Sequence, residues 1–168
     1  ALATLLQQLS ADAAPGSWLV FQGRGRVLLE QLVGHSLPVQ HGNSQLLPLP
    51  WLDQAGFDEV LWASDFNAVR GEDSLVRALW AGQPFVWHIY PQDDDAHHAK
   101  LDAFLDWLQA PDDWRAFHHA WNGIGDAALP ALTPARLARW RACALEARAR
   151  LLAQADLVSQ LLALATAG

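Results

Sequence analysis

Residues 67–92 read NAVRGEDSLVRALWAGQPFVWHIYPQ, and this stretch decides the fold of a chain of 168 residues. Its polar start, Arg70–Ser74, gathers charged and hydroxyl side chains around Gly71. Apolar residues then recur at helical spacing as far as Gly82. The aromatic and β-branched run Phe85–Tyr90 follows, so the stretch predicts a helix and then a buried strand. Because a helix N-terminus carries unpaired N–H groups and a partial positive charge, the polar start is a candidate anion site.

The segments on both sides of this stretch alternate in a similar way. Apolar runs predict strands at 18–21, 37–40, 45–49 and 60–63, and apolar periodicity predicts helices at 1–11, 27–33, 99–108, 111–122, 134–152 and 157–164. Strands that alternate with helices favour a parallel sheet with helices on both faces. We therefore expect one Rossmann-like α/β domain over residues 1–168. Gly23 and Gly25 form a G-x-G without a third glycine in place, so a tight turn is its simpler explanation.

Composition limits the classes of function that this chain can serve. The formal net charge of −7 argues against a nucleic-acid-binding surface, which needs a basic face. No apolar run approaches the roughly 18–20 residues that span a bilayer, and no signal peptide is recognisable. The one cysteine, Cys143, is expected to be a buried, neutral thiol. We expect a cytoplasmic protein without a membrane or nucleic-acid partner, and the helical pattern that starts at Ala1 suggests a fragment of a larger enzyme.

The polar loop has two interpretations. In the first, the hydroxyl and backbone N–H of Ser74 bind a phosphate oxygen, and Arg70 adds charge-assisted hydrogen bonds. Glu72 and Asp73 would repel a phosphate, so they suit the hydroxyls of a sugar instead. In the second, the loop is a capping cluster in which Asp73 or Ser74 caps the helix and Glu72 pairs with Arg70 or Arg77.

The segment Trp51–Phe57 is a candidate base pocket. Two aromatic residues six positions apart flank Gln54, just after a proline-ended strand. Such rings can stack on a base while the amide side chain recognises its polar edge. The alternative is core packing, because nine tryptophans are more than a single site requires.

The histidines give weaker signals. His97 and His98 follow the acids Asp93–Asp95 and suggest a metal site, but adjacent histidines point to different helix faces and no second ligand cluster is present, so a solvated helix start is expected. The pair at 118–119 is expected at the surface. His88 is expected either as a hydrogen-bonded core histidine or at the mouth of the site. We expect no metal and no catalytic Ser-His-Asp or Cys-His set.

The run DFNAVRGEDSLVRALWAGQPFVWHIYPQ, followed by AHHAKLDAFLDWL, closely resembles the protein-arginine rhamnosyltransferases that modify bacterial elongation factor P, the EarP family. The strong resemblance covers Leu46–Leu108. It implies an inverting enzyme of the two-Rossmann-domain (GT-B) type that transfers rhamnose from dTDP-β-L-rhamnose to an arginine of elongation factor P. It also implies that this chain is the C-terminal, donor-binding half, that the catalytic base belongs to an aspartate pair outside it, and that the isolated chain is inactive.

The resemblance assigns roles to the acidic residues of the loop and to the end of the following strand. Glu72 matches the acidic residue that is essential in the family and is the candidate catalytic residue. Asp73 and Ser74 match residues that contact the donor, and Tyr90 matches a tyrosine at the diphosphate.

The same resemblance places Trp51, Gln54 and Phe57 in the thymine pocket of the family. Trp51 departs from the phenylalanine that is common at its position. Arg70 and Gly71 complete the candidate substrate-binding residues. Two rival functions remain: a GT-B transferase that uses another nucleotide sugar, and a non-catalytic module that binds a nucleotide sugar or docks elongation factor P.

Overall fold

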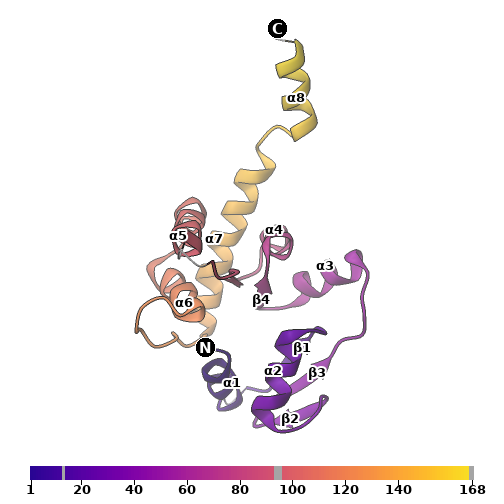
Figure 1. Ribbon diagram of the computed structural model, residues 1–168, viewed down its shortest axis with the longest axis vertical. Helices are drawn as coiled ribbons and strands as arrows, with labels where there is room; N and C mark the ends of the chain where they lie inside the picture. The colour runs from indigo at the N-terminus through magenta and orange to yellow at the C-terminus, as the bar shows by residue number, and fades with distance from the viewer. Residues whose placement is uncertain (13, 93–95, 167–168) are drawn as a thin grey trace.

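The computed structural model describes residues 1–12, 14–92 and 96–166. In this part of the chain the elements are α1 (Leu2–Ser10), β1 (Gly16–Val20), α2 (Arg24–Val33), β2 (Val39–His41), β3 (Ser44–Pro48), α3 (Gln54–Ala63), β4 (Asn67–Arg70), α4 (Glu72–Ala81), β5 (Phe85–His88), α5 (Ala96–Leu108), α6 (Asp112–Asn122), α7 (Pro134–Leu152) and α8 (Leu157–Thr166). Figure 1 shows α7 running along the long axis of the molecule, with α1, α2 and β1–β3 gathered at the end opposite α8. The α/β class predicted from the sequence is confirmed.

The first sheet has the strand order β1-β3-β2. β1 and β3 are parallel, whereas β2 and β3, close to the strands predicted at 37–40 and 45–49, form an antiparallel hairpin. Gly42 closes this hairpin with a φ of 57°, and a Cβ there would lie 2.4 Å from the carbonyl oxygen of Ser10, so glycine is required on both counts. A small apolar cluster joins this sheet to α1 and α2; its buried members are Leu6, Val20, Leu29, Leu37 and Leu46.

The second sheet is built from the stretch that decides the fold. β4 and β5 pair in parallel, and α4 connects them. Gly71 and Gly82 flank α4 with φ values of 80° and 68°, so each end of the helix lies at a glycine in a conformation that other residues rarely adopt. Leu75 and Leu79 bury the apolar face of α4 in the core. The helix and the strand predicted at 67–92 are both confirmed.

The predicted strand at 60–63 is wrong, because these residues form the last turn of α3. Asp53 caps α3 through a hydrogen bond that its carboxylate accepts from the N–H of Gly56 (2.8 Å). A four-residue apolar run fits a buried helix turn as well as a strand. The true strand, β4, begins at Asn67, whose side-chain amide donates to the carbonyl of Leu61 and joins α3 to the sheet.

The expected single parallel sheet also needs correction. In the described part of the chain, the strands form two separate small sheets, and the first is mixed because it contains the β2–β3 hairpin. The alternation of helices and strands in the sequence specifies the elements but not which strand edges pair.

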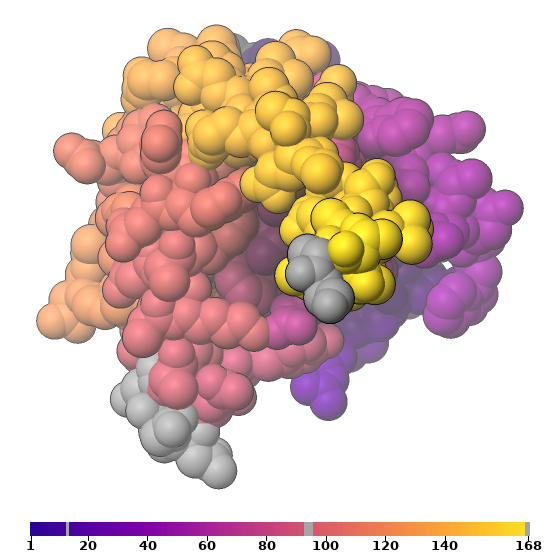
Figure 2. Space-filling view, turned by 90° about the horizontal axis from the view of Figure 1, so that it is seen from above, coloured from indigo at the N-terminus to yellow at the C-terminus, as the bar shows by residue number. Residues whose placement is uncertain are grey.

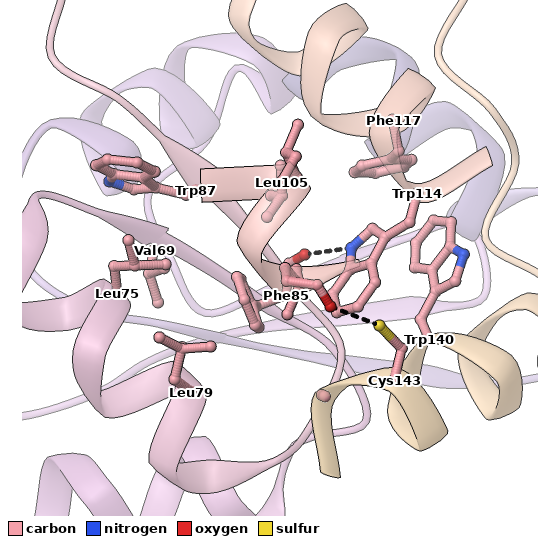
Figure 3. Packing of buried hydrophobic residues seen from close by; sticks show 14 of the residues in the cluster. Val69, Leu75, Leu79, Phe85, Trp87, Leu105, Trp114, Phe117, Trp140 and Cys143 are labelled. Atoms are coloured by element: carbon pink, nitrogen blue, oxygen red, sulfur yellow. Dashed lines mark hydrogen bonds between the residues drawn. The ribbon is translucent and has the colours of Figure 1, made fainter. Parts of the chain in front are cut away.

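The largest core cluster lies between the second sheet and helices α5, α6 and α7 (Figure 3). Trp114 is fully buried, and its indole N–H donates to the carbonyl of Phe85 at 2.8 Å. Its ring stacks on that of Trp140, with centroids 5.5 Å apart and planes 7° from parallel. Cys143 is buried as predicted, and burial raises the pKa of its thiol.

His118 lies in this aromatic core, so its expected surface position is wrong. The ring packs edge-on against Phe85, and Nδ1 lies 3.1 Å from the carbonyl oxygen of Trp114. Because a carbonyl only accepts hydrogen bonds, Nδ1 carries a proton. Nε2 is buried and has no hydrogen-bond partner among the described residues, which favours the neutral ring with Nε2 unprotonated. Burial lowers the pKa of His118 to about 4, because it disfavours the charged ring more than the hydrogen bond to Trp114 favours it.

We expect the protein to lose stability between pH 6.5 and pH 4 because of His118. The unfolded chain binds a proton near pH 6.5, whereas folded His118 does so near pH 4. The stabilising contribution is therefore complete above pH 6.5 and falls as the pH drops, by about 3 kcal/mol in total. Thermal unfolding midpoints measured across this range should fall more steeply for the native protein than for His118→Phe. Equal slopes would contradict the burial of a neutral histidine.

The two C-terminal helices differ in their contacts. Thr133 caps the predicted helix α7, since its hydroxyl accepts a hydrogen bond from the N–H of Arg136, and Pro134 occupies the first turn. α8 extends beyond α7 and projects from the face shown in Figure 2. None of its residues is buried, although five large apolar side chains lie on it. Among the residues given above, no helix is long and apolar enough to cross a membrane.

Candidate functional site

An open pocket of about 340 Å³ lies where three strands end. Phe21 and Gln22 follow β1, the segment from Pro50 to Gln54 follows β3, and Ser74 lies on the helix that follows β4. Ligands of parallel α/β sheets bind at the carboxyl ends of strands, which is where the pocket is found.

The pocket contains the three predicted base-pocket residues. Trp51 is 84% exposed at its rim, so the alternative of core packing is wrong for this residue. Phe57 is partly buried, and its ring lies 4.9 Å from that of Phe21. An exposed indole beside an aromatic pair provides apolar surface for a flat ligand, and Gln54 adds an amide to the same wall.

The N-terminus of α4 supplies the polar wall. Asp73 and Ser74 line the pocket together with Arg77. Arg77 bonds both oxygens of the Asp58 carboxylate at 2.9 Å and one oxygen of Asp73 at 3.1 Å. These two carboxylates raise the pKa of Arg77 further. The structure thus holds Asp73 in an ion pair and leaves Ser74 facing the pocket. Neither residue caps the helix, because the N-cap is Gly71 and no side chain bonds its first turn.

Arg70, Gly71 and Tyr90 form a second group beside the pocket rather than in its wall. The guanidinium of Arg70 lies 4.7 Å from the centre of the Tyr90 ring, a cation–π contact. A Cβ on Gly71 would lie 3.3 Å from Cε2 and the hydroxyl of Tyr90, so glycine allows the ring to approach the backbone. Arg70 Nε is buried and lacks a hydrogen-bond partner among the described residues. A buried donor without a partner is costly and points to a ligand anion.

Glu72 has no ion pair in the described chain with Arg70 or Arg77, the two partners that the sequence suggested. Its carboxylate instead contacts the ammonium of Lys100, which lies 28 residues further on in α5. The candidate catalytic residue therefore lies on the first turn of α4, next in sequence to the pocket residue Asp73.

Three further histidines differ in their surroundings. His97 is buried and Nδ1 accepts from the N–H of Gln92, so its expected solvated position is wrong. The acids at 93–95 lie outside the described residues. His119 pairs with Asp102 at 2.7 Å. His88 is partly buried at the end of β5, where burial and then the charge of Arg70 lower its pKa. Its ring has no hydrogen bond within the described chain, so it lies at the edge of the site.

Within the described residues, no group of three or more histidine, cysteine, aspartate or glutamate side chains could hold a metal ion.

The sequence of this chain matches a known family along almost its entire length. The model of the family described as elongation-factor P (EF-P) rhamnosyltransferase EarP matches residues 1–166. The chain belongs to the EarP family. The resemblance of the stretch at 67–92 to this family is therefore confirmed.

Individual EarP relatives are similar to part of this chain. The protein-arginine rhamnosyltransferase of Pseudomonas putida is 47% identical over 110 residues, which cover 62% of this chain and 29% of the relative. That of Shewanella oneidensis is 46% identical over 112 residues, which cover 62% and 28% of the two chains.

A solved structure extends the likeness to the whole fold. It is described as the structural basis for EarP-mediated arginine glycosylation of translation elongation factor EF-P. It matches with a TM-score of 0.77 at 35% identity, over 99% of this chain and 57% of the solved chain. This chain therefore spans little more than half the length of that EarP protein.

Sequence reasoning missed three residues of the candidate site. Phe21 and Gln22 line the pocket directly after β1, and the rule that ligands lie at the carboxyl ends of strands could have found them. Lys100 reaches Glu72 from another helix, and spacing along the chain gave no sign of that contact.

Proposed function

We propose that this chain forms the donor-binding part of a protein-arginine rhamnosyltransferase. The reaction is an inverting transfer of rhamnose from dTDP-β-L-rhamnose to an arginine of elongation factor P, on a GT-B enzyme whose C-terminal Rossmann-like domain is residues 1–168. The observation that carries this proposal is one pocket in which the base-stacking candidates and the N-terminus of α4 meet. Membership of the EarP family supports the reaction class.

The pocket wall offers an aromatic part for the base of a nucleoside diphosphate and a polar part for its diphosphate. Trp51 and Phe57 provide aromatic surface for the thymine, and Gln54 can bond its polar edge. The diphosphate then lies toward Ser74, where the free N–H groups and the dipole of α4 favour negative charge. Asp73 is no obstacle to this arrangement because Arg77 neutralises it.

The chemistry follows from where charge develops. Negative charge builds on the departing diphosphate as its bond to the sugar breaks. The backbone N–H groups at Ser74, the hydroxyl of Tyr90 and the guanidinium of Arg70 stabilise this charge as fixed dipoles and cations, so no metal is required. Glu72 orients the rhamnose and stabilises its developing positive charge. The base that activates arginine lies in a part of the parent protein outside residues 1–168, so the isolated chain is inactive.

Donor preference tests this function. By titration calorimetry, the full-length parent protein should bind dTDP-rhamnose at least about tenfold more tightly than UDP-glucose, because apolar contacts of a thymine methyl with the aromatic wall of Trp51 and Phe57 contribute energy of this order. Trp51→Ala should weaken dTDP-rhamnose binding by about tenfold through the loss of stacking.

Trp62→Ala is the matched control, since Trp62 is also exposed but lies outside the pocket. It should leave donor binding unchanged. Preference for UDP-glucose would favour the rival transferase with another nucleotide sugar. Donor binding without any transfer by the full-length protein would favour the non-catalytic module.

A further inference from the structure

Lys100 is the single lysine of the chain, whereas the other ten of its 11 lysine and arginine residues are arginines. It lies on α5, and its ammonium contacts Oε1 of Glu72 on α4. We propose that Lys100 is a positioning residue that holds the Glu72 carboxylate in the orientation needed at the sugar. This inference rests on the proposed role of Glu72.

The side chain of Lys100 is anchored to the core on one side. Lys100 and Phe104 are four residues apart on α5 and therefore lie on the same face of that helix. Both contact Trp87 of β5, which is 2% exposed: the Phe104 ring packs edge-on with centroids 5.5 Å apart, and Lys100 Nζ lies over the Trp87 ring, 5.9 Å from its centre. The ammonium thus lies between the buried indole of Trp87 and the carboxylate of Glu72. The cation–π contact with the indole limits the positions that the ammonium can occupy.

The contact leaves half of the carboxylate available. Lys100 bonds Oε1, and Oε2 of Glu72 has no partner in the described part of the chain. A compact ammonium with one contact suits this task, because it orients the group and keeps an oxygen free for a substrate hydroxyl.

The solvent exposure of the Lys100–Glu72 pair distinguishes a positioning role for Lys100 from a role in folding stability. The side chains of Lys100 and Glu72 are 51% and 68% exposed, so water screens the pair and it contributes little to folding stability. A free glutamate at a helix start samples several rotamers, however, and catalysis depends on groups held in one geometry. Loss of Lys100 should therefore reduce turnover while the fold remains intact.

The test measures rhamnose transfer to elongation factor P by the full-length protein, with mass spectrometry as the readout. Lys100→Met keeps most of the aliphatic stem and removes the charge. It should lower kcat about tenfold, change the KM for dTDP-rhamnose less than twofold and leave the thermal midpoint within about 2 °C. Lys100→Arg restores the cation and should recover kcat to within about threefold. Arg115→Met breaks another exposed ion pair of α5, with Asp106, and should leave transfer unchanged.

Glu72→Gln separates failure of this inference from failure of the proposed function. If Glu72→Gln transfers rhamnose normally, the proposed role of Glu72 is wrong and the inference falls with it. If Glu72→Gln is impaired but Lys100→Met is not, Lys100 has no positioning role and the proposed function stands. A large drop in the midpoint of Lys100→Met, or no recovery with Lys100→Arg, would also overturn the inference. With Glu72→Gln already present, Lys100→Met should have no further effect on kcat.

Discussion

Glu72→Gln in the full-length protein is expected to lower rhamnose transfer to elongation factor P by at least about 100-fold, or about 2.7 kcal/mol of transition-state stabilisation. Glutamine keeps the size and the polar end of the side chain but removes its negative charge. A developing oxocarbenium ion requires that charge, and Glu72 lies on the first turn of α4, whose N-terminus contributes to the pocket that we assign to the donor. Single-turnover kinetics with dTDP-rhamnose, followed by mass spectrometry of the acceptor, measure the effect.

Glu59→Gln is the matched control for this experiment. Glu59 is an exposed carboxylate on the neighbouring helix α3 and has no ion pair in the described chain. It should transfer rhamnose normally. Donor binding by Glu72→Gln should stay within about threefold of the native value, since the base and the diphosphate contacts are intact. A loss of binding as large as the loss of transfer would assign Glu72 to donor recognition instead of catalysis.

The sequence predicted the parts of the fold that local chemistry specifies. Gly71 and Gly82 mark the ends of α4 because both positions have a positive φ. The apolar face of the helix between them can be recognised from the spacing of its own residues. The positive φ of Gly42 and the hydroxyl cap of Thr133 likewise depend on residues close by in the chain. In the site, the spacing of Trp51, Gln54 and Phe57 was sufficient to bring them together, because they lie within two turns of one segment.

Features that depend on tertiary contacts were not predictable in this way. The run at 60–63 is apolar and fits either a helix turn or a strand. The hydrogen bond from the Asn67 side chain to the carbonyl of Leu61, which joins this helix turn to β4, forms only in the folded chain. His118 is polar in sequence but lies among aromatic rings, where burial keeps it neutral and one hydrogen bond to a backbone carbonyl holds its Nδ1. The contact between Lys100 and Glu72 joins helices separated by a strand, so no periodicity indicates it.

Trp114→Ala is expected to destabilise the protein by about 3–5 kcal/mol, the range for removing a large aromatic side chain from a packed core. The indole is fully buried and contacts the rings of Phe85, His118 and Trp140. Its N–H donates a hydrogen bond to the carbonyl of Phe85. Alanine leaves a cavity and a buried acceptor with one partner fewer. Since the stability of a domain is about 5–15 kcal/mol, this is a large fraction of the total, and the unfolding midpoint should fall by roughly 10 °C.

Two further variants decide which property of Trp114 is responsible. Trp114→Phe keeps an aromatic ring but loses the hydrogen bond to Phe85 and part of the stacking on Trp140, so it should lie between the native protein and alanine. Trp62→Ala removes the same side chain from a position that is 55% exposed, and it should shift the midpoint by no more than about 2 °C. Similar shifts for Trp62→Ala and Trp114→Ala would contradict the packing in Figure 3, because burial is the main difference between the two tryptophans.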